Sequence, residues 1–350
     1  MKLEALLLRI WYCPRPPLLA WLLWPLSGLF AALAAVNKAC FKLGLKASTQ
    51  LPVPVVVVGN ITVGGTGKTP LTIALARRLG ELGWQVGIIS RGYGGAAQLP
   101  TEVLPDSLPA TVGDEPLLLR RATGVPVFVA RQRAAAGQAL LARYPAVNLL
   151  LCDDGLQHYA LGRALEICVV DGARGLGNGL RLPAGPLRES PARLRKVNAV
   201  VVNGVSATES IKSISAAEYP AGYLGDYQMT LAAGACYRLD QPSLTATAAS
   251  LPVRGVLHAL VGIGNPERFF ATLRAQGYAF RPCAFPDHHA FVPADLPVLG
   301  ADDALIVTEK DAVKLAAMNP PPPSDRIWVL PVAAHLSPDL ACRIDEFLKR

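Results

Sequence analysis

The sequence predicts an α/β protein in which an N-terminal helical segment precedes two lobes, each built on a mainly parallel sheet. The main observation is a series of short, apolar, β-branched runs at 53–58, 85–90, 126–130, 147–152, 166–170 and 198–202. Helix-compatible stretches separate most of these runs, for example 70–82 and 132–143. Because the runs hold consecutive apolar residues instead of alternating apolar and polar ones, the strands are expected to be buried on both faces, which is typical of a parallel sheet covered by helices.

A second series of strand-like runs, near 257–262, 304–308 and 327–332, predicts the second lobe. Residues 205–255 are rich in Ala, Ser, Thr and Gly and carry weaker strand signals, so we place the junction near residue 225. The expected division is an N-terminal segment at 1–46, a first lobe at 47–225 and a smaller second lobe at 226–350.

Composition excludes several classes of protein. Of the 350 residues, 51% are hydrophobic and 17% are charged, which excludes a disordered chain. The net charge is 34 − 26 = +8, and residues 1–46 contribute six cations and one anion, or +5 of it. Because the basic charge is concentrated at the N-terminus, we expect no nucleic-acid partner. The seven cysteines are widely spaced and form no CxxC, so a disulfide framework or a zinc site is not expected, and a reducing compartment is indicated.

The N-terminal segment is predicted to contact a membrane. Between Arg15 and Lys38 lie 22 residues without a formal charge, and three of the five tryptophans fall within the first 24 residues. Tryptophan favours the lipid headgroup region, and flanking cations favour anionic lipid. A spanning helix, a signal peptide and an ordinary core helix are the alternatives. Pro25, Ser27 and Gly28 are expected to break a spanning helix, so a helical hairpin or kinked helix in the interface is favoured.

A nucleotide phosphate loop follows the first strand of the first lobe. Residues 55–59 (VVVVG) lead into 60–70 (NITVGGTGKTP), after which a helix is expected. Glycines allow backbone N–H groups to converge on phosphate oxygens, and a helix N-terminus adds partial positive charge. The strict pattern has glycine where this chain has Thr62. The residues expected to hold ATP are Thr62, Val63, Gly64, Gly65, Thr66, Gly67, Lys68 and Thr69, with Lys68 on the β- and γ-phosphates and the Thr69 hydroxyl on Mg²⁺.

The run Leu149–Cys152 ends in Asp153 and Asp154, the form of a Walker B strand whose acidic end holds Mg²⁺. An acidic pair after a strand can also be a solvated turn, but the phosphate loop upstream favours the magnesium interpretation. Because ATP is cytosolic, the same loop argues against export of the chain. Together these features specify an NTP hydrolase or a kinase without choosing between them.

Further segments resemble one family, the tetraacyldisaccharide 4'-kinases of lipid A biosynthesis in Gram-negative bacteria. The resemblance covers nearly the whole chain, through the apolar N-terminus and the blocks at 59–70, 90–94 (SRGYG), 113–116 (GDEP), 153–158 (DDGLQH), 182–189 (LPAGPLRE), 262–266 (GIGNP), 285–288 (FPDH) and 308–312 (TEKDA). It implies two Rossmann-like lobes of the P-loop kinase type, with catalysis in the cleft between them. It also implies transfer of the γ-phosphate of ATP, with Mg²⁺, to the 4'-hydroxyl of a tetraacylated glucosamine disaccharide 1-phosphate, which gives lipid IVA.

The resemblance also implies a location and partners. The enzyme would lie on the cytoplasmic face of the bacterial inner membrane, held peripherally through its N-terminal segment. Its partners would be the lipid substrate and the membrane surface, with no obligate protein partner evident. An amphiphilic acceptor agrees with a membrane-held enzyme, because such a substrate need not leave the bilayer.

Catalytic residues follow from the same blocks. A sugar hydroxyl needs a base to take its proton, and Asp114 corresponds to the family's catalytic carboxylate, with His288 as the histidine that orients it. The adjacent His289 leaves the choice of histidine open, and a polar turn or an incomplete metal site is the alternative for 287–289.

Four other positions complete the expected site. Glu115 joins Asp153 and Asp154 in handling Mg²⁺, and the motif does not divide the work between the two aspartates. His158 matches a family active-site position or caps a helix. Arg188, after a rigid Pro-Ala-Gly-Pro loop, is expected to clamp phosphate or stabilise transition-state charge, unless Glu189 or solvent satisfies it. Arg91 is expected to contact phosphate in a similar way. Lys310 and Asp311 receive no chemical role.

Two other classes of function agree with part of the sequence. A membrane-associated switch ATPase of the deviant-Walker type carries a lysine directly before its glycine pair, where this chain has Val63. A non-enzymatic nucleotide-binding scaffold would need no catalytic base, so the sequence blocks around Asp114 and His288 would have no function in it. Both are disfavoured relative to the kinase.

Overall fold

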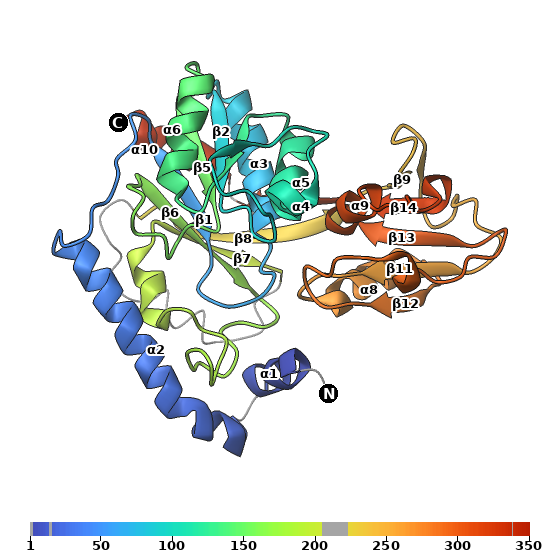
Figure 1. Ribbon diagram of the computed structural model, residues 1–350, viewed down its shortest axis with the longest axis horizontal. Coiled ribbons are helices and arrows are strands. Elements are labelled where there is room, and N and C mark those ends of the chain that lie inside the picture. Colours follow the sequence, from blue (N-terminus) through green and yellow to red (C-terminus); the bar gives the residue numbers. More distant parts are fainter. Residues whose placement is uncertain (1–2, 14–15, 205–222, 338) are drawn as a thin grey trace.

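The structure is a computed structural model that describes residues 3–13, 16–204, 223–337 and 339–350, and its two lobes lie side by side (Figure 1). The stretch 205–222, within the segment where weak strand signals were expected, lies outside the described residues. The predicted α/β class, with two mainly parallel sheets, is confirmed.

The first lobe is built on a nine-stranded sheet in the order β15-β8-β7-β6-β1-β5-β2-β4-β3. Only the pairs β3–β4 and β8–β15 are antiparallel. The strands are β1 (Val55–Gly59), β2 (Val86–Ser90), β3 (Thr101–Glu102), β4 (Val127–Val129), β5 (Leu149–Asp153), β6 (Leu165–Asp171), β7 (Ala199–Asn203), β8 (Gly225–Ala233) and β15 (Val332–Ser337). In β1, β2, β4, β5 and β7 every residue is buried, as their apolar runs predicted.

Helices cover both faces of this sheet. On one face lie α3 and α5, whose Leu71, Leu75 and Leu117 pack with Val56 and Val58 of β1 in one core cluster. On the other face α6 packs with Val55 and Val57. The helical elements of this lobe are α3 (Lys68–Glu81), α4 (Pro109–Val112), α5 (Asp114–Thr123), α6 (Arg133–Arg143), α10 (Leu340–Leu348) and the 3₁₀ turn η1 (Pro191–Lys196).

The second lobe has a six-stranded sheet in the order β10-β9-β14-β13-β11-β12. Its strands are β9 (Cys236–Arg238), β10 (Thr245–Ala246), β11 (Leu257–Val261), β12 (Arg281–Ala284), β13 (Ala304–Thr308) and β14 (Ile327–Leu330). The helices α8 (Pro266–Ala275) and α9 (Glu309–Ala316) and the 3₁₀ turns η2 (Pro293–Asp295) and η3 (Ser324–Arg326) accompany it.

The two sheets do not divide the chain at residue 225, where the junction between the lobes was expected. β8 begins at Gly225 and pairs with β7, and β15 pairs antiparallel with β8, so both strands belong to the first sheet. The expected single strand at 327–332 is interrupted at Pro331, whose ring removes a backbone donor, and β14 and β15 form on either side in different sheets. After β15, α10 buries Leu340 and Ile344 in the core of the first lobe. The chain therefore leaves the first lobe along β8 and returns along β15.

The N-terminal segment forms α1 (Leu3–Trp11) and the 25-residue helix α2 (Leu18–Lys42), which runs along one side of the first lobe (Figure 1). The expected break is wrong, because α2 continues through Pro25, Ser27 and Gly28. Ser27 anchors the middle of the helix to the first lobe: its Oγ donates to the Arg181 carbonyl at 2.8 Å and accepts from the Ala184 N–H at 3.1 Å. By length and composition α2 is able to cross a membrane, and only 11% of its most apolar window is buried.

Candidate active site

The phosphate loop lies between β1 and α3, at the carboxyl edge of the first sheet. Gly64 and Gly67 have φ angles of +104° and +99°. A Cβ on Gly67 would lie 2.3 Å from Asn203 Nδ2, so no larger residue fits there. Asn203, at the end of β7, donates from its side-chain amide to the Thr66 carbonyl at 2.8 Å and so attaches the loop to the sheet. Thr69 follows Lys68 in the first turn of α3 and is half-buried.

A second loop supports the phosphate loop from the side. Thr62, where the strict motif has glycine, is buried and forms a β-bridge with Leu187. Val63 N donates to the Pro186 carbonyl at 2.8 Å, and Arg188 N donates to the Ile61 carbonyl at 2.7 Å. The threonine therefore belongs to a pairing that brings Arg188 next to the phosphate loop. Gly65, between these contacts and Lys68, has open space where a Cβ would be.

Three predicted residues converge at the end of β5. Asp154 Oδ1 lies 3.7 Å from Lys68 Nζ, and its Oδ2 lies 3.3 Å from Arg188 Nη1. Asp154 has a φ of +49°, a conformation that costs a non-glycine residue energy and is concentrated at functional sites. Burial alone would raise the pKa of Asp154, but the Lys68 and Arg188 cations lower it to about 2. Asp154 is therefore a permanent anion that orients two cations.

Asp153 has different surroundings. It is 1% exposed, and its Oδ1 accepts from Thr72 Oγ1 at 3.3 Å. Burial and the nearby Glu115 carboxylate raise the pKa of Asp153 to about 7. A buried carboxylate with so little positive charge beside it favours a cation, because a bound cation would remove the cost of ionising it.

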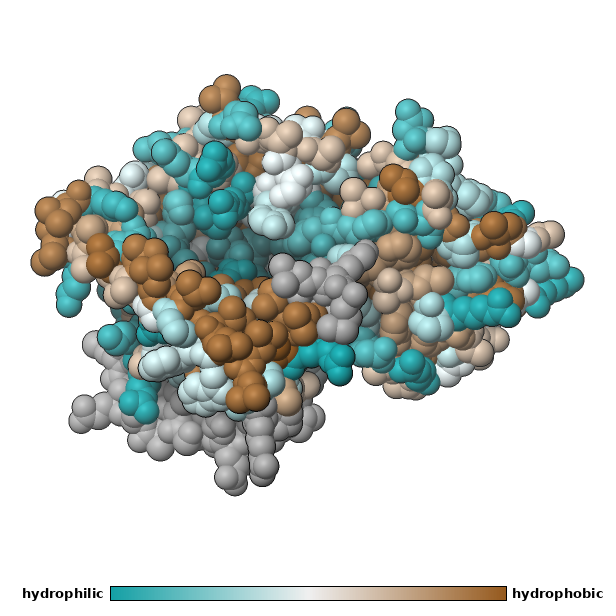
Figure 2. Space-filling model, turned by 60° about the horizontal axis from the view of Figure 1, so that its bottom comes forward, coloured by the Kyte–Doolittle hydropathy of each residue, from teal (hydrophilic) through white to brown (hydrophobic). Residues whose placement is uncertain are grey.

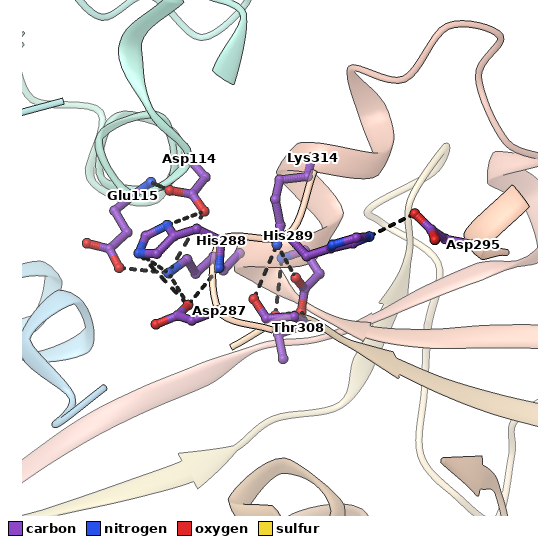
Figure 3. Close-up of polar contacts among 11 residues, drawn as sticks. Asp114, Glu115, Asp287, His288, His289, Asp295, Thr308 and Lys314 are labelled. Carbon is purple, nitrogen blue, oxygen red and sulfur yellow. Dashed lines mark hydrogen bonds and ion pairs between the residues drawn. The ribbon is translucent and has the colours of Figure 1, made fainter. Parts of the chain in front are cut away.

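Asp114 and His288 face each other across the boundary between the lobes (Figure 3). Asp114 is the first residue of α5 in the first lobe, and His288 lies on the loop after β12 in the second. His288 Nδ1 is 3.2 Å from Asp114 Oδ2, and Glu115 N donates to Asp114 Oδ1 at 2.9 Å. Burial alone would raise the pKa of Asp114, but the hydrogen bond with His288 and the charge of Lys310 lower it below its ordinary value. At neutral pH Asp114 is thus an ionised acceptor with an oriented side chain.

The two adjacent histidines, His288 and His289, make different contacts. His289 points away from Asp114 (Figure 3): its Nε2 lies 2.8 Å from Asp295 Oδ2, and its ring stacks on Phe285 at 4.7 Å. His288 has a φ of +57°. Within the described ranges, no group of three or more His, Cys, Asp or Glu residues is arranged to hold a metal ion by itself.

We expect His288→Asn to lower kcat by about 100-fold, because Asp114 would lose the group that orients it. His289→Asn is the matched control, since it changes the same residue type on the same loop but removes only contacts with Asp295, Phe285 and Phe291, away from Asp114. We expect kcat of this control to stay within about threefold of wild type. Steady-state kinetics of both variants measure the difference, and a larger loss in the His289 variant would contradict the assignment.

A cavity of about 1270 Å³ opens beside Asp153 and Asp154. Its wall includes Arg91, His158 and Arg188, and one side is formed by Ala34, Lys38 and neighbouring residues of α2. Figure 2 shows a recess lined by hydrophilic residues, bordered by the apolar band of the N-terminal helix. Burial and the Arg133 and Arg163 cations lower the pKa of His158 to about 4, so this histidine is uncharged at neutral pH. The cavity thus reaches from the acidic end of β5 to the apolar helix α2.

The cavity is lined by six of the predicted residues, Arg91, Glu115, Asp153, Asp154, His158 and Arg188. The structure adds two residues that sequence analysis did not assign. Tyr93 lines the cavity, and its ring centroid lies 4.9 Å from that of His288. Tyr93 therefore connects the cavity with the Asp114–His288 pair. Lys310 lies 2.9 Å from Glu115 Oε1 and 3.1 Å from Asp287 Oδ1. Both residues belong to blocks quoted above, so their presence in those blocks was the available signal.

Comparison with known proteins identifies the family. Residues 19–349 match the sequence model described as Tetraacyldisaccharide-1-P 4'-kinase. The chain belongs to this family. It is 58% identical over 333 residues to the tetraacyldisaccharide 4'-kinase of Chromobacterium violaceum, covering 94% of each chain. It is 51% identical over 329 residues to the enzyme of the same name from Dechloromonas aromatica, covering 94% of this chain and 92% of the relative.

The fold agrees with a solved member of the family. The structure of LpxK from Aquifex aeolicus in complex with ATP superimposes with a TM-score of 0.75 at 25% identity, and the match covers 94% of this chain and 99% of that one. The resemblance drawn from the sequence blocks is confirmed: this member of the 4'-kinase family is a kinase with the predicted α/β fold.

Proposed function

We propose that this chain transfers the γ-phosphate of ATP to the 4'-hydroxyl of a tetraacylated glucosamine disaccharide 1-phosphate, which yields lipid IVA. The observation that supports this best is the Asp114–His288 pair, held at 3.2 Å beside a phosphate loop and near a cavity that reaches α2. A hydrolase acting on water needs no cavity of this size bordered by an apolar helix. A kinase for an amphiphilic sugar needs both.

In the proposed mechanism Asp114 takes the proton of the sugar hydroxyl as its oxygen bonds to the γ-phosphorus, while the bond to the β-phosphate oxygen breaks and ADP leaves. His288 keeps the Asp114 carboxylate oriented. Lys68 and Arg188, both fixed by Asp154, bind the phosphate oxygens and oppose the charge that gathers on them during transfer. Arg91 and His158 contact the acceptor in the cavity.

The residues present fit a magnesium ion bound together with ATP. Thr69, Asp153 and Glu115 offer oxygen ligands, which Mg²⁺ prefers, and Asp153 is a buried carboxylate without a full cationic partner. Mg²⁺ at nucleotide sites takes one or two carboxylates and completes its shell with phosphates and water, so a protein-only cluster is not required. When bound, the ion neutralises charge on the β- and γ-phosphates. Asp154 is left to orient the two cations.

The proposed function is tested by phosphate transfer from [γ-³²P]ATP to the purified tetraacylated disaccharide 1-phosphate. Labelled lipid that requires the wild-type chain supports it. Hydrolysis of ATP without labelled lipid would contradict it and return the interpretation to a switch ATPase.

We further propose that α2 holds the enzyme on the cytoplasmic face of the inner membrane as a peripheral anchor, not as a spanning helix. Figure 2 shows a brown apolar band along this helix. Its exposed leucine and valine side chains are Leu18, Leu19, Leu22, Leu26, Leu29, Leu33 and Val36, and Trp21 and Trp24 are exposed on the same helix. The Ser27 contacts support an orientation along the surface. They attach the middle of the helix to the loop that carries Arg181, which a spanning helix would draw into the hydrocarbon at high cost.

Replacing apolar side chains of α2 by glutamate is expected to release the protein from lipid. The variant Leu22→Glu/Leu29→Glu/Leu33→Glu should bind vesicles of phosphatidylethanolamine and phosphatidylglycerol at least about 100-fold more weakly, because each buried leucine contributes roughly 1.5–3 kcal/mol. Vesicle flotation measures the partition.

The matched control places three glutamates at exposed apolar positions on the lobes, in the variant Leu104→Glu/Leu108→Glu/Val298→Glu. It adds the same charge away from α2, so we expect binding within about threefold of wild type. Equal losses in both variants would show that net charge and not the apolar band controls binding.

A further inference from the structure

Lys310 lies where the two lobes meet. It is the second residue of α9 in the second lobe, and its side chain is only 13% exposed. Its ammonium is 2.9 Å from Glu115 Oε1 and 3.8 Å from Asp114 Oδ2 on the first lobe, and 3.1 Å from Asp287 Oδ1 on its own lobe. A largely buried lysine that faces three carboxylates differs from a surface ion pair, because removing it would leave several anions close together without compensation.

The contacts of Lys310 join the two halves of the catalytic pair. Asp114 and His288 are 174 residues apart and lie on different lobes, so their separation depends on how the lobes are held. Lys310 binds the start of α5 through Glu115, next to Asp114. It also binds Asp287, whose Oδ1 accepts the His288 N–H at 3.0 Å. One ammonium therefore fixes the residues on both sides of the 3.2 Å contact.

Lys310 also constrains the proton on His288. Its Nζ lies 3.4 Å from His288 Nε2, and an ammonium only donates hydrogen bonds. In the neutral ring this contact is a hydrogen bond only when His288 Nε2 accepts, which places the ring hydrogen on Nδ1. Nδ1 is the atom that faces Asp114 Oδ2, so the ring donates to the carboxylate. With the opposite tautomer two acceptors would face each other at this contact.

We propose that Lys310 is a positioning residue for phosphoryl transfer: it joins Asp114 and His288 across the lobe boundary and selects the tautomer in which His288 donates from Nδ1. This inference rests on the proposed function, since it assigns Asp114 as the acceptor of the substrate proton. Lys310 acts through Asp114 and His288, so its role is to position these two residues.

Kinetics of Lys310→Met, Lys310→Arg and Lys314→Met test the first half of the proposal. We expect the methionine variant to lose about 100-fold in kcat with KM for ATP within about threefold, because the phosphate loop does not involve Lys310. Arginine, which keeps the charge and the donors, should recover at least about tenfold of that loss. Lys314 is the matched control: it lies one turn further along α9 and pairs with Asp311 at 2.7 Å within the second lobe. Its loss should lower Tm and leave kcat within about threefold.

Nitrogen NMR of the full-length protein labelled with [¹⁵N]histidine tests whether Lys310 selects the tautomer. The signals of the His288 ring are assigned by comparison with His288→Asn. We expect the Nδ1–H tautomer in the wild type and a mixture of tautomers in Lys310→Met. A hydrogen on Nε2 in the wild type, an unchanged ring spectrum in Lys310→Met, or kcat within threefold of wild type in that variant would each overturn the proposal. Absence of labelled lipid with the wild type would instead refute the proposed function. The NMR measurement would in that case still show whether Lys310 selects the tautomer of His288.

Discussion

Asp114→Asn is expected to lower kcat for phosphate transfer by about 10³-fold, within the range that a positioned general base contributes. Asparagine has the shape of aspartate, and its single amide oxygen still accepts from the Glu115 N–H while its NH₂ group faces His288 Nδ1, so the start of α5 should persist. It cannot take the proton of the sugar hydroxyl at neutral pH. Affinity for ATP should stay within about threefold, because the phosphate loop makes no contact with Asp114.

The measurement combines the labelled-lipid assay with calorimetric titration of ATP. Asp106→Asn is the matched control, since it removes an exposed carboxylate eight residues upstream in the same lobe. We expect this control to have wild-type kcat. A loss of less than tenfold in Asp114→Asn would show that another group takes the proton and would remove the base from the proposed mechanism.

Lys68→Met is expected to impair both binding and transfer. Lys68 begins α3 directly after the phosphate loop, and Asp154 holds its ammonium at the end of β5. Without this cation, the phosphate charge that grows during transfer loses a pre-positioned partner. We expect kcat to fall by about 10³-fold and affinity for ATP by about tenfold, since charge-assisted contacts to phosphate are strong in a partly buried site.

The same two assays measure this variant. Lys349→Met is its control, because it removes an exposed lysine that pairs with Asp345 on α10, away from the site. Loss of transfer with unchanged affinity for ATP would restrict Lys68 to the transition state. Unchanged values for both would contradict its place in the phosphate site.

Local features of the sequence predicted the framework of the site. The buried strands β1 and β5 were recognisable from runs that are apolar at every position, because strands covered on both faces tolerate little else. The phosphate loop was recognisable because its glycines, lysine and threonine must follow each other between a strand and a helix. The carboxyl ends of neighbouring parallel strands meet at one edge, so Lys68 and Asp154 could be expected together.

Features that depend on several distant segments could not be predicted in the same way. The return of β15 and α10 to the first lobe depends on pairing with β8, a hundred residues earlier in the chain. The helix α2 continues through Pro25 and docks at Ser27 against the 181–184 loop, a contact with a segment more than a hundred residues later in the chain. Neither pairing has a signature in the segment itself, because the partner is supplied by another part of the fold.

The fold class, the phosphate loop, the acidic strand end and, through the ordered blocks, the family could thus be predicted from the order of the residues alone. Three features became visible only in the folded chain: His288 and not His289 faces Asp114, Asp154 and Asp153 have different surroundings, and Lys310 reaches both lobes. The difference is one of sequence separation. Burial periodicity and loop chemistry are set by neighbouring residues, whereas the direction of a side chain across a cleft is set by how two separately packed lobes meet.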